Sequence, residues 1–363
     1  MRLAFISGNL TNGGAQRVIS VVSSRLAERG HEVYLYVFSR GEKEYGVSDK
    51  VYLTYMAQSK EEYEKISSLK RFRNLREFLK ESKPQAAVGF MEAGYALYMA
   101  SLGLPVKRIS AIRANPKSVF SRKGLRAWLN RKWFDRSDAV AAQTEAQKCL
   151  LPGNLKAKAC VIPNPVSDDA LENAKTEYGD KCLKLIMAGR LVAVKNYPMV
   201  FEAVSKVHEK YPGITLDIYG SGKLQDELQE KIGGMGLSNS IKLCGWSENT
   251  AEEFKKRDIY ILSSDNEGMP NSLMEAMAVG LPCISTDCET GPADLIKDKE
   301  NGFLIPCGDS GALADRIIKL VEMTKEERQT MGERAHKTMQ NGFGSDIIAQ
   351  KWEKFFEEII GRR

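Results

Sequence analysis

Short apolar runs alternate with amphipathic segments along the whole chain. Runs such as residues 2–7 and 259–262 are almost uniformly apolar, which is typical of strands buried in a parallel sheet. Segments between such runs, for example residues 15–29 and 66–81, carry apolar side chains at helical spacing. This regular alternation of strand and helix predicts an α/β protein with parallel sheets.

The alternation starts again after residue 165, which predicts two domains. The prolines of Ile162-Pro163-Asn164-Pro165 prevent a helix or a central strand from continuing there. We expect a first Rossmann-like domain over residues 1–165 and a second over residues 166–344, with a polar linker through Asp180. A last helix near 345–360 follows the break Asn341-Gly342-Phe343-Gly344 and is expected to pack back on the first domain. The predicted strands are 2–7, 32–38, 51–54, 86–90, 107–112, 138–142, 159–162, 183–189, 214–219, 241–244, 258–262, 282–285 and 302–305.

The composition is that of a soluble globular protein, with 43% apolar and 28% charged residues. No apolar run approaches the ~20 residues that span a bilayer, and the N-terminus becomes polar too soon for a signal peptide. The seven cysteines include no Cys-x-x-Cys pair, and the three histidines lie far apart. We therefore expect neither disulfides nor a zinc site.

The charge is unevenly distributed between the two predicted domains. Residues 1–165 contain 28 basic and 14 acidic residues, a net charge of +14, whereas the remainder contains 25 and 33, a net charge of −8. Such an asymmetry suggests that the first domain faces an anionic partner.

The loop after the apolar run 259–262 carries two glutamates in different settings. Glu267 lies in the loop itself, and Glu275 follows eight residues later, in a helix that Pro270 can open and Gly280 can close. Ligands bind open parallel sheets at the carboxyl ends of strands, where helix N-termini face the crevice. One carboxylate is therefore expected above a pocket and the other about one turn inside the helix. This loop is the strongest candidate for an active site.

Another predicted strand of the second domain ends in cations. Arg190 follows the strand 183–189, and Lys195 comes five residues later, just before Asn196 as a helix cap. Two cations beside a helix N-terminus suit a diphosphate group. Surface charge is the alternative explanation for Arg190 and Lys195 taken alone, but the acidic loop of the same domain favours a functional role.

Two further strand ends contain glycine. Tyr219-Gly220-Ser221-Gly222 lets the backbone approach a ligand closely, or forms a simple tight turn. Cys244-Gly245-Trp246 ends another strand, and its tryptophan either forms a wall for a base or packs against the protein.

In this order and spacing, the segments resemble glycosyltransferase family 4. The matching segments are Gly189-Arg190-Leu191 with Lys195, Tyr219-Gly220-Ser221-Gly222, Gly245-Trp246, Glu267-Gly268-Met269-Pro270 with Glu275, Gly280-Leu281-Pro282 and Asn301-Gly302-Phe303-Leu304. The resemblance extends over nearly the whole chain. It implies a GT-B fold, in which two Rossmann-like domains face across a cleft, and a hexosyltransferase whose donor is a nucleotide sugar, expected to be UDP-linked.

The resemblance also implies roles for individual residues. Arg190 and Lys195 would neutralise the departing diphosphate, Glu267 would contact the donor sugar as the third catalytic residue, and Glu275 would bind the ribose. The family retains anomeric configuration and needs no metal ion or other cofactor, because cations and N–H groups take the place of a metal. The rest of the donor site would comprise Gly13, Gly14, Gly220, Gly222, Gly245, Trp246, Gly268, Met269, Pro270, Asn271, Ser272 and Leu273.

The first domain departs from two patterns. The turn that holds Gly13 and Gly14 lacks the Gly-x-Gly-x-x-Gly spacing of dinucleotide-binding proteins, which argues against an NAD enzyme. In the resembled family, the Gly-Gly pair faces the cleft. Arg113 stands where that family often carries a cleft histidine, and an arginine cannot act as a base. We therefore expect Arg113 and Asn115 to bind the acceptor; a contact of Arg113 with the leaving group is the alternative.

Two basic stretches of the first domain mix cations with aromatic residues. Residues 117–136 predict a helix with Leu125, Trp128, Leu129 and Trp133 on one face, which either covers the sheet or lies on anionic lipid. Residues 70–80 form a second basic patch, and no nucleic-acid-binding module is recognisable. We therefore expect a cytoplasmic enzyme, peripheral at the inner face of the membrane, that extends a lipid-linked or saccharide acceptor in surface polysaccharide or glycan assembly.

Two other functions remain open at this point. Another GT-B sugar enzyme, such as a phosphorylase or an epimerase, would be favoured by a lysine-bound pyridoxal phosphate or by conversion of the donor without an acceptor. A non-catalytic membrane scaffold that binds sugar nucleotides is the other alternative. A scaffold would have lost its catalytic turnover, and the intact set of expected catalytic and donor-binding residues argues against this: Arg190, Lys195, Glu267 and Glu275.

Overall fold

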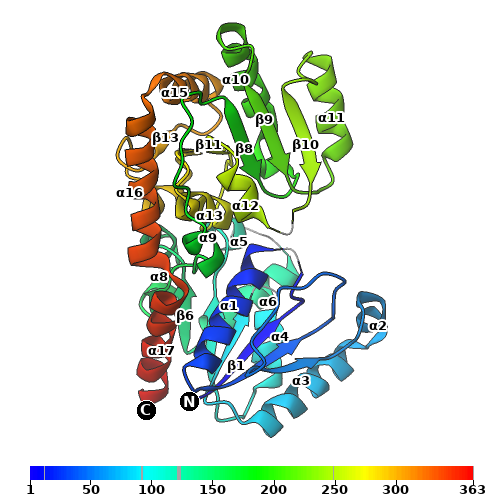
Figure 1. Ribbon diagram of the computed structural model, residues 1–363. Coiled ribbons are helices and arrows are strands. Elements are labelled where there is room, and N and C mark those ends of the chain that lie inside the picture. Colours follow the sequence, from blue (N-terminus) through cyan, green and yellow to red (C-terminus); the bar gives the residue numbers. More distant parts are fainter. Residues whose placement is uncertain (12, 91–92, 121–123, 248, 363) are drawn as a thin grey trace. The chain divides into compact units, whose positions relative to one another are not determined.

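The computed structural model describes residues 1–11, 13–90, 93–120, 124–247 and 249–362, without the side chains at 125–127, 129 and 130. The chain divides into two compact units (Figure 1). Unit 1 comprises Met1–Pro165 with Ser345–Arg363, and unit 2 comprises Val166–Gly344. The division therefore coincides with the expected boundary after residue 165, and the last helix belongs to unit 1.

Unit 1 is built on a parallel sheet with the strand order β3-β2-β1-β4-β5-β6-β7. The central strand β1 pairs with β2 and β4, with Leu3 opposite Val33 and Ala86. The bounds are β1 (Arg2–Ser7), β2 (Glu32–Val37), β3 (Tyr52–Tyr55), β4 (Ala86–Phe90), β5 (Lys107–Ala111), β6 (Ala139–Ala142) and β7 (Ala159–Val161).

Helices cover both faces of this sheet, because successive side chains of a strand point to opposite faces. Leu3 and Phe5 of β1 belong to one apolar cluster, whereas Ala4 and Ile6 belong to another. The helices are α1 (Gly14–Glu28), α2 (Lys60–Lys65), α3 (Ser68–Ser82), α4 (Ala93–Ala100), α5 (Pro116–Phe120), α6 (Leu125–Asp135), α7 (Glu145–Cys149), α8 (Gly153–Lys156) and α17 (Ser345–Gly361).

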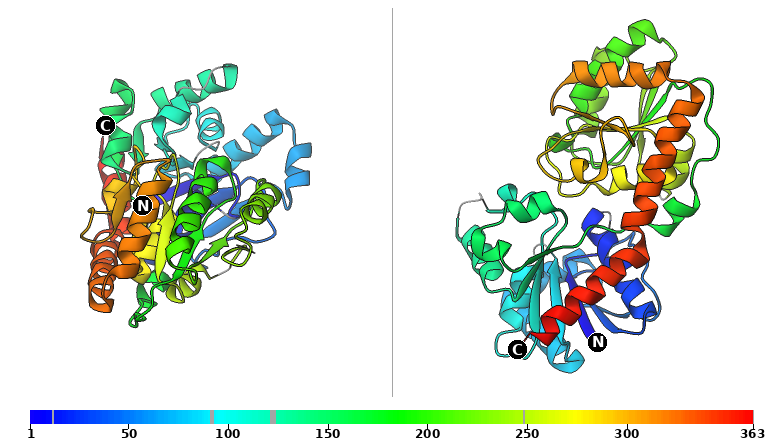
Figure 2. Two further views of the ribbon diagram at one scale, coloured as in Figure 1. Left: turned by 90° about the horizontal axis from the view of Figure 1, so that it is seen from above. Right: turned by 90° about the vertical axis from the view of Figure 1, so that its left-hand side faces the viewer.

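The C-terminal helix α17 packs beside α1 in unit 1 (Figure 2). Its side chains Trp352, Phe355 and Phe356 are buried in the same cluster as Phe5. Each such burial stabilises the packing by about 1.5–3 kcal/mol. An ion pair of Arg29 with Glu353 at 2.5 Å adds a polar contact at the edge of this interface.

Unit 2 contains a second parallel sheet with the strand order β10-β9-β8-β11-β12-β13. Side chains again alternate between two clusters, with Ile259 and Ile261 of β11 on one face and Tyr260 and Leu262 on the other. The strand bounds are β8 (Lys184–Ala188), β9 (Thr215–Tyr219), β10 (Ile241–Gly245), β11 (Ile259–Leu262), β12 (Cys283–Thr286) and β13 (Phe303–Ile305).

Two expectations for unit 2 were wrong in detail. The predicted linker contains the helix α9, and beyond it the Tyr178 hydroxyl donates to the Gly280 carbonyl at 2.6 Å, so the segment packs against the unit. The predicted break at residues 341–344 is shorter, because α16 continues through Phe343. The helices are α9 (Asp168–Glu172), η1 (Ala193–Lys195, a 3₁₀ turn), α10 (Tyr197–Lys210), α11 (Gln225–Gly234), α12 (Thr250–Lys255), α13 (Asn271–Val279), α14 (Pro292–Leu295), α15 (Ser310–Glu322) and α16 (Lys325–Phe343).

No helix in the described part of the chain combines the length and the apolar character that crossing a bilayer requires.

Candidate active site

The strand order of unit 2 has a switch point at one place on its sheet. Chain order reverses between β8 and β11, which are neighbours with Ile186 opposite Tyr260. At such a switch point, the connections of the two strands leave toward opposite faces and open a crevice at their carboxyl ends. Lys195 follows β8 and Glu267 follows β11, so the topology brings the two predicted catalytic residues together.

Lys195 and Glu267 form an ion pair at this switch point. The Lys195 Nζ atom lies 2.7 Å from Glu267 Oε1, and each side chain is 15% exposed. The Ser264 hydroxyl donates to the same carboxylate oxygen at 2.6 Å. The ammonium group is therefore held in place by a carboxylate that is itself fixed by a hydroxyl group.

The loops that carry this pair are tied to each other through their backbones. The N–H of Asp265 donates to the Val194 carbonyl at 2.9 Å, and the Ser263 hydroxyl donates to the Lys195 carbonyl at 2.6 Å. Asn196 precedes α10 with a left-handed φ of 46°, but its side chain does not cap the helix as expected. Instead, the amide donates to Asp265 Oδ1 at 3.0 Å and adds a third link between the loops.

Glu275 lies on α13, buried at 6% exposure. The Thr250 hydroxyl at the start of α12 donates to Glu275 Oε2 at 2.8 Å. A buried carboxylate costs free energy unless hydrogen bonds or cations compensate it, and hydroxyl donors are suitable partners. The two predicted acidic residues are thus in different environments: Glu267 pairs with an ammonium group, and Glu275 accepts from a hydroxyl group.

The N-terminus of α13 lies between these two carboxylates along the chain. Pro270 is the N-cap residue, and its carbonyl accepts from the Met274 N–H at 3.1 Å. The side chains of Met269 and Leu273 are buried in the apolar core, so their contacts with a ligand would come from the backbone. The Tyr260 hydroxyl donates to Ser272 Oγ at 2.7 Å and fixes the first turn. Helix N-termini present N–H groups that suit anionic oxygens.

The glycines after β9 are required by backbone packing. A Cβ atom on Gly220, whose φ is +140°, would lie 1.9 Å from the Gly189 carbonyl oxygen. One on Gly222 would lie 2.3 Å from the Leu191 carbonyl oxygen. The close approach is therefore to the segment that carries Arg190. No contact with a ligand is needed to explain these two glycines.

Arg190 itself is exposed, and it takes part in no ion pair among the described residues. Its backbone is anchored, because the Tyr197 hydroxyl lies 3.2 Å from the carbonyl oxygens of both Gly189 and Arg190. Burial raises the pKa of Tyr197, so its hydroxyl stays protonated as a donor at neutral pH. Gly245 has a left-handed φ of +74°, and the side chain of Trp246 is 41% exposed.

Gly13 and Gly14 occupy the corresponding switch point of unit 1, which lies between β1 and β4. Gly13 is the N-cap of α1, and its carbonyl accepts from the Arg17 N–H at 3.0 Å. The two glycines thus begin a long helix at the carboxyl edge of the sheet. Their assignment to the donor site stays a prediction.

Arg113, predicted to bind the acceptor, is enclosed within unit 1. Its Nη1 atom donates to Asn164 Oδ1 at 2.8 Å, and its guanidinium carbon lies 4.9 Å from the ring centre of Phe90. Its Nε and Nη2 atoms are buried without a hydrogen-bond partner among the described residues. Burial lowers the pKa of Arg113 to about 9, which still leaves the side chain charged at neutral pH. Asn115 is buried, whereas Arg113 as a whole residue is partly buried. The Asn115 Oδ1 atom accepts the Lys117 N–H at 2.9 Å at the start of α5.

The basic segment 117–136 is not one continuous helix. It contains the end of α5 and the whole of α6, and Arg122 and Lys123 lie outside the described residues. Trp133 is buried in the core of unit 1, as expected for a helix that covers the sheet, whereas Trp128 is 49% exposed. The side chains of Leu125 and Leu129 are not described.

Several residues that position the site escaped the sequence analysis. The Ser264 hydroxyl donates to the Glu267 carboxylate, and the Thr250 hydroxyl donates to the Glu275 carboxylate. The Thr290 hydroxyl donates to the backbone carbonyl of Glu267. Gly291 has a φ of +100°, and a Cβ there would lie 2.6 Å from the Gly268 carbonyl oxygen. Ser264 and Thr290 follow the ends of β11 and β12, so a search for polar residues after every predicted strand would have found both of them.

Comparison with known proteins identifies the family of the chain. A family model described as Glycosyltransferase Family 4 matches residues 12–170, and one described as Glycosyl transferases group 1 matches residues 169–338. The two models together account for most of the chain.

Named relatives include proteins of similar length and longer ones. The chain is 28% identical over 368 residues to a GalNAc-alpha-(1->4)-GalNAc-alpha-(1->3)-diNAcBac-PP-undecaprenol alpha-1,4-N-acetyl-D-galactosaminyltransferase of Campylobacter jejuni, covering 99% of both chains. It is 33% identical over 230 residues to an exopolysaccharide phosphotransferase of Streptomyces coelicolor, which covers 62% of this chain but only 24% of that protein.

A solved structure supports the fold. The structure of HepE from Anabaena in complex with UDP superimposes with a TM-score of 0.80 at 17% identity, over 99% of this chain and 100% of that one. The family models, the named relatives and the two parallel-sheet units agree with one another. The chain belongs to the GT-B glycosyltransferases of the family 4 type and is a hexosyltransferase.

Proposed function

We propose that this protein is a retaining glycosyltransferase that moves a hexose or an N-acetylhexosamine from a UDP-linked donor to a lipid-linked glycan acceptor, in surface polysaccharide or glycan assembly. The observation that carries the proposal is the meeting of Lys195, Glu267 and the N-terminus of α13 at the switch point of unit 2. A cation, an anion and a set of N–H donors there match the parts of a nucleotide sugar.

In the proposed complex, the diphosphate faces Arg190, Lys195 and the first amides of α13. The ribose hydroxyl groups donate to the buried carboxylate of Glu275, and the transferred sugar lies beside Glu267. The base lies along Gly245 and Trp246. The side chain of Pro270 can offer only an apolar contact, because a proline nitrogen carries no hydrogen.

The reaction breaks the bond between the anomeric carbon and the β-phosphate oxygen. Negative charge grows on that phosphate, and fixed cations and N–H dipoles aimed at it lower the barrier. The acceptor hydroxyl oxygen bonds to the anomeric carbon from the face that the phosphate leaves, and its proton passes to the departing phosphate. Such a front-face substitution retains configuration. Lys195 and Arg190 supply the positive charge, so we propose that no metal ion or other cofactor takes part.

The choice of donor and acceptor follows the relatives. The Campylobacter jejuni relative is named for transfer of N-acetylgalactosamine to an undecaprenol-linked saccharide, and another relative, AmsD of Erwinia amylovora, is named for amylovoran biosynthesis. Solved HepE complexes contain UDP or UDP-glucose. We propose that this enzyme likewise works at the inner face of the cytoplasmic membrane, where the cations of unit 1 would meet anionic lipid.

The test is a transfer assay with the full chain, a panel of nucleotide sugars and undecaprenyl-diphosphate-linked oligosaccharides. We expect release of UDP that depends on the acceptor, a product heavier by one sugar, and the donor's anomeric configuration in that product. Lys195→Ala should abolish most of this turnover, whereas Lys206→Ala, at a surface position of α10 in the same unit, should not. Absence of transfer with every donor would contradict the proposal. Conversion of a donor without acceptor would indicate an epimerase, and phosphate-dependent release a phosphorylase.

A further inference from the structure

Two cysteines occupy equivalent positions at the carboxyl edge of the unit 2 sheet. Strands β12 and β13 are parallel neighbours, and Thr286 lies opposite Ile305 in the last pair of their register. Cys288 and Cys307 each follow two residues after this pair. The N–H of Asp287 still donates to the Ile305 carbonyl at 2.7 Å, so the ladder continues one step toward both cysteines.

The spacing of this sheet edge is compatible with a disulfide. Neighbouring strands lie about 4.7–4.9 Å apart, and the two Cα atoms of a disulfide are usually about 4.4–6.8 Å apart. Side chains at equivalent positions of parallel neighbours point to the same face of the sheet. A bond between Cys288 and Cys307 therefore requires little movement of the backbone. Both are free thiols in the structure, as are the other five cysteines.

Both thiols lie near the same backbone carbonyl. The S–H of Cys288 donates to the Ser264 carbonyl oxygen at 2.9 Å, and the Cys307 Sγ atom lies 3.9 Å from that oxygen. The Thr286 hydroxyl donates to the same oxygen at 2.6 Å. The side chain of Ser264 in turn holds the Glu267 carboxylate. The two thiols therefore support the backbone of the residue that fixes Glu267.

The two cysteines differ in their access to solvent. Cys307 is exposed, whereas Cys288 is only 4% exposed, and burial raises the pKa of Cys288 to about 12. Partial burial also raises the pKa of Cys307, although a hydrogen bond from Cys288 offsets part of this rise. The carboxylates of Asp265 and Asp287 raise it further. A dissolved oxidant therefore meets Cys307 first, and Cys288 is placed to complete a disulfide.

We propose that Cys288 and Cys307 form a reversible redox pair, whose disulfide disturbs the loop that carries Glu267 and lowers the transfer activity. The oxidant is hydrogen peroxide. The Cys307 thiolate attacks one peroxide oxygen, the O–O bond breaks, and the other oxygen takes up a proton and leaves as water. The Cys288 sulfur then bonds to the sulfur of the sulfenic acid, whose oxygen leaves as a second water. Two thiols are thus oxidised by two electrons, and one peroxide is reduced to two waters.

The disulfide weakens the support of the loop after β11. A bridged sulfur carries no hydrogen, so of the three groups around the Ser264 carbonyl only the Thr286 hydroxyl can still donate. The Glu267 side chain, held by Ser264, then shifts relative to Lys195. A misplacement of about 1 Å can cost about 100-fold in rate. The loss of transfer rests on the proposed function, whereas formation of the disulfide does not depend on it.

The experiment exposes the full chain to hydrogen peroxide in a Cys149→Ser background, which removes the other exposed cysteine. Peptide mapping by mass spectrometry without a reducing agent locates the disulfide. Hydrogen exchange of the Asp265 amide, which donates to the Val194 carbonyl at 2.9 Å, reports on the loop without any substrate. The transfer assay measures turnover before oxidation, after oxidation and after reduction with dithiothreitol.

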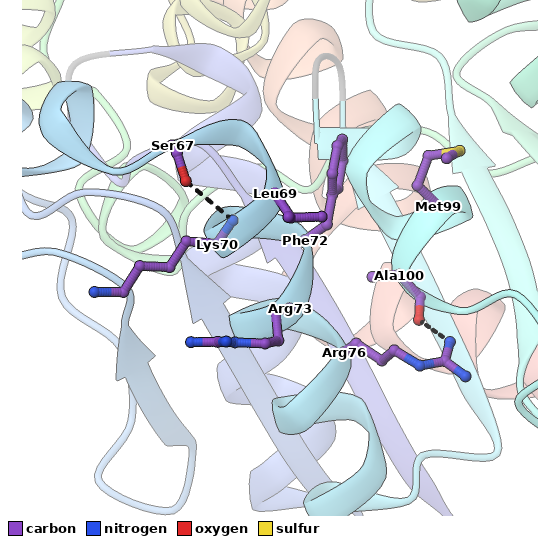
Figure 3. A pocket seen from close by; sticks show the side chains of 8 residues that line it. All are labelled: Ser67, Leu69, Lys70, Phe72, Arg73, Arg76, Met99 and Ala100. Atoms are coloured by element: carbon purple, nitrogen blue, oxygen red, sulfur yellow. Dashed lines mark hydrogen bonds between the residues drawn. The ribbon is translucent and has the colours of Figure 1, made fainter.

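Two variants in the same background serve as controls. Cys288→Ser keeps a hydrogen-bond donor but cannot form the disulfide. The matched control combines Cys307→Ser with Met99→Cys, which moves the exposed thiol to a place without a partner. Met99 is 36% exposed and lines a pocket of about 560 Å³ between α3 and α4 (Figure 3). None of the residues described as lining this pocket is a cysteine.

We expect a disulfide between Cys288 and Cys307, which forms faster at alkaline pH because the thiolate is the attacking species. Oxidation should accelerate exchange of the Asp265 amide and lower the turnover at least about 10-fold. Dithiothreitol should reverse both effects. Cys288→Ser and the Cys307→Ser/Met99→Cys control should retain most of their turnover under the same treatment.

Three results would overturn the inference: no disulfide between Cys288 and Cys307 at neutral or alkaline pH, a complete disulfide that leaves the Asp265 exchange or the turnover unchanged, or an equal loss of turnover in the Met99→Cys control. If the reduced protein transfers no sugar from any donor, the proposed function fails. Peptide mapping and the Asp265 exchange then still decide whether the redox pair exists.

Discussion

The ion pair between Lys195 and Glu267 should be strong in the empty site and weak once a nucleotide is bound. At 2.7 Å and an effective dielectric constant near 20, the Coulomb attraction is about 6 kcal/mol. Desolvation of two side chains that are each 15% exposed offsets most of this attraction. We therefore expect a coupling free energy of about 1–3 kcal/mol in the empty protein.

A double-mutant cycle with Lys195→Met, Glu267→Gln and the double variant measures this coupling. Urea unfolding is followed by hydrogen exchange of β8 and β11, so that the unfolding of unit 2 is observed apart from that of unit 1. The control cycle uses Lys210 and Glu322 of the same unit, which approach to 2.6 Å but are 56% and 47% exposed. That pair should show a much weaker coupling, because solvent screens the attraction between two exposed side chains.

UDP should reduce the first coupling and leave the control unchanged, because the proposed complex transfers the Lys195 ammonium from the carboxylate to the diphosphate. A coupling below about 0.5 kcal/mol in the empty protein would refute the ion pair. A coupling that UDP does not change would refute the contact of Lys195 with the nucleotide.

Three further predictions concern the surroundings of the site and the last helix. Gly220→Ala should destabilise unit 2 by about 2–5 kcal/mol in urea unfolding, because of backbone strain and the clash with Gly189. Gly236 has a φ of +70° but open space around it, so Gly236→Ala should cost only about 1–2 kcal/mol. Equal losses of stability in the two variants would contradict the close packing at Gly220. Glu275→Ala should weaken UDP binding about 10- to 100-fold in calorimetry, since a hydrogen bond to a charged group contributes about 1.5–3 kcal/mol, and an unchanged affinity would remove the ribose contact. The hydrogen bond from Arg29 holds the pKa of Glu353 below its usual 4.5. The carboxylate of Glu353 therefore stabilises α17 above about pH 4.5, and this stabilisation is lost as the pH falls through the lower pKa of the folded state. Urea unfolding of Glu353→Gln should lack this acid-dependent step, which is about 1 kcal/mol or less at a partly exposed site.

The strands were predictable because each buried parallel strand carries its signal in a short apolar run. The local pattern was less informative where packing decides the structure. The linker gained α9 and contacts to α13 because Tyr178 finds a buried acceptor on Gly280, which is about 100 residues later in the sequence. The helix α16 passes through Gly342 because the cost of one glycine, about 1 kcal/mol, is small beside the packing of a long helix.

The sequence indicated that the candidate site residues follow strands, but it did not indicate their contacts. Lys195 and Glu267 each follow a strand, which the sequence indicates, but their pairing depends on β8 and β11 being neighbours, which only the sheet order supplies. Arg113 was predicted to bind the acceptor from the position of a cleft histidine. It is enclosed because Trp352, from the far end of the chain, packs within 5.9 Å of its guanidinium carbon.

The most direct test of leaving-group catalysis is the turnover of Arg190→Ala and Lys195→Ala at saturating UDP-sugar, with the UDP dissociation constant measured separately. Both cations are proposed to act mainly on charge that develops as the phosphate leaves. Leaving-group catalysis predicts that kcat falls about 10²- to 10³-fold in each variant while UDP binding weakens less than about 10-fold. An unchanged kcat in both variants would contradict this role of the two cations.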